Sequence, residues 1–145
     1  MADNDLEHMI LIVTGASFRA EEMDRPLAYR ISEEVAKRLG PDLPWRAVVI
    51  SDVLYINDKQ LSSCPTISIG GPGVNGLSAL LYRELPSVLT IDNVLLIQMD
   101  VDLNDVRCCF WGMDHDQTVE ALELFLKLGH LDHFLAGITK GATRK

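Results

Sequence analysis

The stretch Thr66–Gly76, with the sequence TISIGGPGVNG, decides the fold of this chain. A short apolar run ends in four glycines and one proline within seven residues, and a helical pattern follows. This order predicts a strand, a tight turn and the start of a helix. Because glycine has no side chain, such a turn brings backbone N–H groups close to anything bound there. We therefore expect a binding site at this turn.

Similar short apolar runs elsewhere in the chain predict the other strands. β-branched and aliphatic residues fill residues 9–14 and 47–51, and a further run covers 107–112. The runs 88–91 and 94–99 flank Asp92-Asn93, which favours a two-residue hairpin turn between two antiparallel strands. Residues 53–56 either extend the strand at 47–51 or form a separate short piece.

Amphipathic segments alternate with these strands. Apolar residues recur at every fourth position from Leu27 to Leu39, which predicts a helix over residues 24–39 with Asp24 as its N-cap. Residues 16–23 before it are expected to form a loop. Further helices are expected at 75–85, 116–128 and 131–138.

The alternation of strands and helices predicts an α/β fold built as a single domain over residues 9–138. We expect a mainly parallel, doubly wound sheet of about five strands, Rossmann-like or flavodoxin-like, with helices on both faces and an antiparallel hairpin at one edge. Residues 1–8 are interpreted as a disordered acidic N-terminus and 139–145 as a flexible tail. A length of 145 residues suits one compact core.

Composition argues against several classes of partner. The formal net charge is −8, so the phosphates of a nucleic acid would be repelled and we expect no nucleic-acid partner. No apolar run approaches the roughly 20 residues that cross a bilayer, so we expect no membrane partner. The acidic start lacks the pattern of a signal peptide, which favours a cytoplasmic location. Cys64, Cys108 and Cys109 are expected to be reduced thiols.

In sheets of this kind, ligands bind outside the carboxyl ends of the strands. That rule gathers four segments at one edge: residues 15–19, 51–52, 70–75 and 112–115. Our leading hypothesis is a small anionic ligand, nucleotide-like or phosphorylated, although the reaction is not assignable. The residues expected to bind it are Gly70, Gly71, Gly73, Asn75, Ser17, Arg19 and Asp114.

The roles within this expected site differ. Backbone N–H groups of the glycines would hold the anion, Asn75 would orient it, and Asp52 would meet a hydroxyl. The alternative is that the turn serves geometry alone and that Asn75 simply caps the next helix. The lysine and Ser/Thr pair of a P-loop are absent from the turn, which argues against ATP hydrolysis of that type.

A second hypothesis is a small hydrolase or transferase that uses His115 as the base and Asp52 as its acidic partner. His115 stands between Asp114 and Asp116, which favour its charged form. Helix capping is the competing interpretation for both aspartates, because Asp114 and Gln117 have the spacing of a capping box. We expect no metal site, since His130 and His133 have no third ligand nearby in the sequence. We assign no cofactor.

The segment Leu11–Ser17, LIVTGAS, resembles the opening of the short-chain dehydrogenases. The resemblance implies a dinucleotide-binding turn, but Phe18–Glu21 follow where the family has further glycines. The tyrosine and lysine that the family places four positions apart are also missing from a suitable context. The match covers about seven residues of a chain much shorter than a dehydrogenase domain. We therefore reject this family and interpret the segment as a buried strand that ends in a glycine turn.

The C-terminal helical region suggests a third hypothesis, a non-catalytic interaction module. Its apolar residues do not fit one narrow stripe, so more than one side of it must be covered. A second subunit would supply such a cover, and we expect a homodimer formed through these helices. The apolar residues are Leu122, Leu124, Phe125, Leu126, Leu128, Leu131, Phe134, Leu135 and Ile138.

Overall fold

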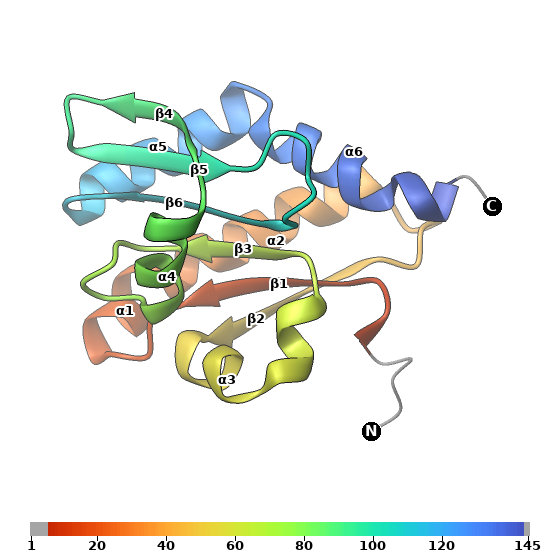
Figure 1. Ribbon diagram of the computed structural model, residues 1–145, viewed down its shortest axis with the longest axis horizontal. Coiled ribbons are helices and arrows are strands. Elements are labelled where there is room, and N and C mark those ends of the chain that lie inside the picture. The colour runs from red at the N-terminus through yellow and green to blue at the C-terminus, as the bar shows by residue number, and fades with distance from the viewer. Residues whose placement is uncertain (1–5, 144–145) are drawn as a thin grey trace.

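One six-stranded sheet forms the centre of the protein (Figure 1). The structure, a computed structural model, describes residues 6–143. The strand order is β2-β1-β3-β6-β5-β4. The strands are β1 (Met9–Thr14), β2 (Arg46–Ser51), β3 (Thr66–Ile69), β4 (Ser87–Ile91), β5 (Leu95–Met99) and β6 (Arg107–Gly112).

The sheet is mostly parallel with an antiparallel edge. Strands β2, β1, β3 and β6 run parallel, and β5 and β4 add two antiparallel pairings beyond β6. The expected hairpin is present between β4 and β5. Its turn residues Asp92 and Asn93 have φ values of 51° and 58°, as a type I′ turn requires at both central positions. The α/β class and the antiparallel edge are confirmed, and the sheet has six strands rather than about five.

Helices cover both faces of the sheet (Figure 1). Alternate residues of β1 point to opposite faces: Ile10 and Ile12 belong to the core under α2, α5 and α6, whereas Leu11 and Val13 belong to the core under α3 and α4. The helices are α1 (Phe18–Met23), α2 (Arg25–Leu39), α3 (Asp52–Asn57), the 3₁₀ helix η2 (Lys59–Ser63), α4 (Gly76–Glu84), α5 (His115–Lys127) and α6 (His130–Thr143).

Two short helices, α1 and α3, were not predicted from the sequence. The expected loop at 16–23 contains α1, and residues 53–56, expected either to extend the strand at 47–51 or to form a separate short piece, belong to the separate helix α3. Serine caps begin both helices: Ser17 Oγ accepts from the Ala20 amide at 3.2 Å, and Ser51 Oγ accepts from the Leu54 amide at 3.2 Å. These caps satisfy N–H groups that a helix of six residues otherwise leaves without partners.

Asp24 stands at the N-cap position of α2, but its side chain does not cap the helix. Its backbone is helical, with φ −95° and ψ −32°, and its amide donates to the Ala20 carbonyl at 2.8 Å as the C-cap of α1. An N-cap residue usually has extended backbone, which turns its side chain toward the first amides of the helix. The helical backbone of Asp24 does not do so, and α2 has no side-chain cap hydrogen bond there.

Both termini contain more structure than expected. Helix α6 continues past Ile138 to Thr143, and the buried Thr139 donates its hydroxyl to the Leu135 carbonyl at 2.7 Å. Near the N-terminus, Leu6 packs against the second core, and the Arg46 amide donates to the His8 carbonyl at 2.9 Å. Residues 6–8 and 139–143, which were expected to belong to a disordered N-terminus and a flexible tail, thus lie within the described structure, and 139–143 belong to α6. Residues 1–5 and 144–145 lie outside the described residues.

The apolar residues of the C-terminal helices are covered within the chain. Leu122, Phe125 and Phe134 are fully buried in the core that α2 and the sheet share with α5 and α6. Leu128 is an exception and is half exposed. The pattern that suggested a second subunit is thus explained inside one chain, and the dimer stays a prediction.

The cysteine prediction is confirmed, since Cys64, Cys108 and Cys109 are all free and buried. Burial raises the pKa of the Cys109 thiol to about 12 and that of Cys108 well above its ordinary value, so both are unreactive thiols at neutral pH. Among residues 6–143, no helix is both long and apolar enough to cross a membrane.

Candidate functional site

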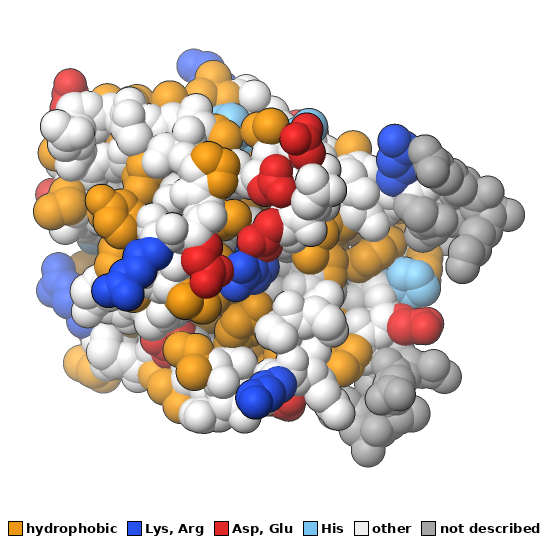
Figure 2. All heavy atoms as spheres, viewed as in Figure 1, with side chains coloured by type: hydrophobic (Ala, Val, Ile, Leu, Met, Phe, Trp, Pro, Cys, Tyr) orange, Lys and Arg blue, Asp and Glu red, His pale blue; other side chains and the backbone are white. Residues whose placement is uncertain are grey.

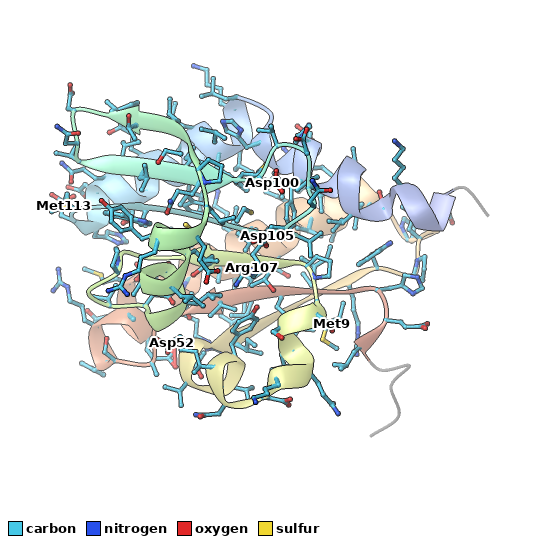
Figure 3. The ribbon with its side chains drawn as sticks, viewed as in Figure 1. Met9, Asp52, Asp100, Asp105, Arg107 and Met113 are labelled. Carbon is cyan, nitrogen blue, oxygen red and sulfur yellow. The ribbon has the colours of Figure 1, made fainter. Side chains whose placement is uncertain are left out.

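A cavity of about 500 Å³ lies at the carboxyl ends of β3 and β6, beside α1. Its walls are residues of α1 with Asp24, the glycine turn from Gly70 to Val74, and the segment from Trp111 to His115 with Thr118. Parts of three of the four segments expected at this edge meet in it. The fourth, Ser51-Asp52, does not line it: Figure 3 labels Asp52 near the start of α3 and Met113 just beyond β6.

The start of α4 is already satisfied by the protein's own side chains. Asn75, which is 1% exposed, accepts from the Leu77 and Ser78 amides at 2.9 and 3.2 Å. Its side-chain N–H groups donate to the carbonyls of Val13 and Ile69 at 3.2 and 2.9 Å. With both ends of its amide engaged, Asn75 fixes the turn to the sheet and does not orient a ligand.

Asp52 supplies the negative charge that the N-terminus of α4 favours. Its Oδ2 accepts from the Gly76 amide at 2.7 Å, while its Oδ1 is buried without a partner in the described structure. Asp52 is therefore bound to the first amide of α4, and the Gly76 N–H is not available to a ligand anion. The predicted pairing of Asp52 with His115 is not brought together in the cavity, because only His115 lines it.

Two amides of the glycine turn stay available. The Val74 and Asn75 amides donate to the Gly71 carbonyl, and the Gly70 amide donates to Phe110. For the amides of Gly71 and Gly73, the described part of the chain provides no acceptor. Both residues line the cavity, so these two N–H groups are candidate donors for a bound molecule.

Asp24 is the site residue that sequence reasoning missed. It is only 7% exposed, lines the cavity, and receives no hydrogen bond on its carboxylate from any described residue. Gly70, with φ +106°, passes so close that a Cβ there would stand 2.7 Å from Asp24 Oδ2. Burial raises the pKa of the Asp24 carboxyl, and the charges of His115 and Arg19 partly oppose that rise. The local sequence predicted only a helix cap, so nothing in it signalled this role.

Of the remaining predicted residues, Asp114, His115 and Arg19 line the cavity and Ser17 does not. Asp114 lines the cavity but also caps α5, where its Oδ1 accepts from the Gln117 amide at 2.9 Å. His115 begins α5, and its Nδ1 is buried without a partner among the described atoms. Arg19 lines the cavity from α1. Ser17 does not line it, since its hydroxyl is the cap of α1.

The apolar part of the wall comes from Met23, Val74, Trp111 and Met113, of which Met113 is 68% exposed. Phe18, next to Arg19 on α1, is 84% exposed. Figure 2 shows hydrophobic side chains between acidic and basic ones over the face that it presents. The cavity thus combines an apolar wall with a small number of polar groups, as small-molecule sites do.

The glycine of the LIVTGAS segment has a structural cause. A Cβ on Gly15 would stand 1.9 Å from the Val74 carbonyl oxygen, so the end of β1 packs directly against the glycine turn. Only glycine permits this approach. The segment that resembles a dinucleotide-binding turn thereby helps to fix the wall of the cavity.

Comparison with known proteins adds no relative: no family model, no curated protein and no solved structure matches this chain. Any functional conclusion therefore depends on the geometry of the cavity.

Proposed function

We propose that this protein binds a small molecule with an anionic group in the cavity beside the glycine turn. The observation that carries the proposal is that the unpaired amides of Gly71 and Gly73 and the guanidinium-bearing Arg19 belong to one cavity. Backbone N–H groups and arginine are the donors that carboxylates and phosphates favour. The apolar body of the ligand would pack against Met23 and Trp111.

The position and size of the cavity support this function. A volume of about 500 Å³ falls within the roughly 300–1,000 Å³ of small-molecule sites. We infer further that the sheet is doubly wound in the Rossmann-like or flavodoxin-like manner, because β1 has β2 on one side and β3 on the other. Such sheets bind ligands outside the carboxyl ends of the strands, and the cavity lies there, between α1, which follows β1, and the segments that follow β3 and β6.

A ligand screen with a matched pair of variants tests this proposal. Thermal shifts would be measured with nucleotides, sugar phosphates and small carboxylates, and hits confirmed by calorimetry. Arg19→Gln should weaken a hit by about tenfold or more, since one charge-assisted hydrogen bond is lost. Arg83→Gln is the control, because Arg83 is exposed on α4 and does not line the cavity. A screen without hits, or equal affinities for the two variants, would contradict the proposal.

A second candidate is a hydrolase or transferase that uses His115 with Asp24, in the role that the sequence analysis gave to Asp52. The observation that favours it is a buried carboxyl of raised pKa whose charge interacts with that of His115 in the same cavity. Carboxyl groups and imidazoles in such surroundings are typical acid–base catalysts.

Broad hydrolase and transferase screens would test this second candidate. Any activity found should fall at least about a hundredfold in His115→Ala, the usual size of an acid–base contribution. His133→Ala is the control, because His133 lies against the Val101 carbonyl and does not line the cavity. Activity that survives in His115→Ala would reject the assignment.

A further inference from the structure

The charges around the cavity do not suit a strongly anionic ligand. Arg19 and, when it is protonated, His115 contribute positive charge, whereas Asp24 and Asp114 contribute two negative charges, so the lining carries no net positive charge in either state of His115. The whole chain is acidic as well, with a formal net charge of −8. A phosphate dianion would therefore find no excess of positive charge here. A ligand with one negative and one positive group would meet a matching charge at each end.

The Asp24 carboxylate specifies where the positive group belongs. A buried carboxylate without hydrogen bonds is costly, and its cost is removed when a donor binds to it. Asp114 is less available, because one of its oxygens accepts the Gln117 amide. By contrast, Asp105 on the antiparallel side of the sheet has its own cation, with Arg107 Nη2 2.8 Å from its Oδ2; Figure 3 labels both residues. Asp24 has no such protein donor in the described part of the chain.

The two ends of the ligand must be close together. Asp24 lies against Gly70, while the free amides belong to Gly71 and Gly73. Because three residues span at most about 10 Å even when fully extended, the acceptor and the donors share one short turn. A compact molecule reaches both.

From this arrangement we propose that the ligand is a small zwitterion, an amino carboxylate whose carboxylate binds Arg19 and the amides of Gly71 and Gly73 while its ammonium binds Asp24. This inference rests on the proposed function and narrows it from anions in general to one class. The ammonium supplies the hydrogen bonds that Asp24 lacks, and the two ligand charges together leave the net charge of the site unchanged.

A paired set of probes tests the inference. Glycine, β-alanine, 4-aminobutyrate and 6-aminohexanoate would be compared with acetate, propionate, butyrate and hexanoate, and with inorganic phosphate and ribose 5-phosphate. Amide chemical shifts of Gly71 and Gly73 report occupancy, and calorimetry gives affinity. At least one amino carboxylate should bind tenfold or more tightly than its deamino partner, as expected for a charge-assisted hydrogen bond.

Two variants assign that preference to Asp24. In Asp24→Asn, the amino carboxylate should bind less than about twofold more tightly than its deamino partner. In Glu22→Gln, the tenfold preference should remain, because Glu22 is exposed on α1 and outside the cavity. If phosphates or plain carboxylates bind as tightly as the amino carboxylates, the inference fails and the proposed function stands. If no probe shifts Gly71 or Gly73, the proposed function fails with it.

Discussion

Two aspartates on either side of the glycine turn are nearly equally buried and are used differently. Asp52 is 9% exposed and Asp24 is 7% exposed. Asp52 holds the Gly76 amide at 2.7 Å and so stabilises the start of α4, whereas Asp24 receives no hydrogen bond from the described residues and lines a cavity. The difference teaches that burial alone does not identify a functional carboxylate. Asp52 keeps one oxygen without a partner but is held through the other, whereas Asp24 has a hydrogen bond from the described residues on neither oxygen and faces the cavity.

The glycine turn likewise has one side that is hydrogen-bonded within the protein and one side that is not. Its inner side, centred on Asn75, is fully hydrogen-bonded to β1, β3 and α4. Its outer side keeps the amides of Gly71 and Gly73 free of acceptors in the described structure. We therefore expect substitutions on the inner side to cost stability, and substitutions on the outer side to cost binding.

The largest effect is expected for Asn75→Ala. The substitution removes the cap of α4 and the side-chain donor to the carbonyls of Val13 and Ile69, so it should destabilise the protein by about 3 kcal/mol. Asn57→Ala is the control, because Asn57 makes one exposed hydrogen bond to the Val53 carbonyl. Urea unfolding would measure both. Equal losses would show that Asn75 is not the anchor of the turn.

The next largest expected effect is a difference in stability between alanine substitutions at two glycines, Gly15 and Gly73. Gly15→Ala places a Cβ against the Val74 carbonyl oxygen, so either the strand end or the turn must move, at a cost of about 2 kcal/mol. Gly73→Ala meets open space and should stay within about 0.5 kcal/mol of the wild type. Thermal unfolding of the two variants side by side measures this contrast. It is contradicted if Gly15→Ala proves as stable as Gly73→Ala.

The smallest expected change in stability is a gain rather than a loss. Asp24→Asn should stabilise the protein by about 1 kcal/mol at pH 7, as is common when a site residue is replaced by a neutral one of the same shape. Because burial raises the folded-state pKa of Asp24 above its ordinary value of 3.8, the cost of its charge is absent below pH 3.8. That cost appears as the pH rises through the folded-state pKa. The advantage of the variant should therefore shrink at low pH, and a variant less stable than the wild type at pH 7 would refute this.

Much of the fold is predictable from the sequence because its signals are local. The run Thr66–Ile69 and the glycines after it specify strand and turn, and Asp92-Asn93 specifies the hairpin. The short helices α1 and α3 were missed because each has only six residues and depends on a serine cap, Ser17 or Ser51, rather than on periodicity.

The position of the cavity could be predicted from the sequence, but only some of the residues that line it could be. The rule for strand ends correctly placed the glycine turn, Arg19 and His115 at one edge of the sheet. It could not show that Asn75 and Asp52 form hydrogen bonds within the protein. These bonds join Asn75 to Val13 and Asp52 to Gly76, which are distant in the sequence. Nor could it show Asp24, which is buried next to Gly70, a residue distant from it in the sequence.

The central claim is that the Asp24 carboxylate is held in the cavity without a protein partner. Its most direct test is a pH titration of the Asp24 side-chain carboxyl carbon by NMR, with Asp24→Asn to assign the signal. We predict a midpoint above the ordinary pKa of 3.8, because burial disfavours the charged form. A midpoint at or below 3.8 would mean that hydrogen bonds or cations of the protein already satisfy this carboxylate, and would contradict the claim.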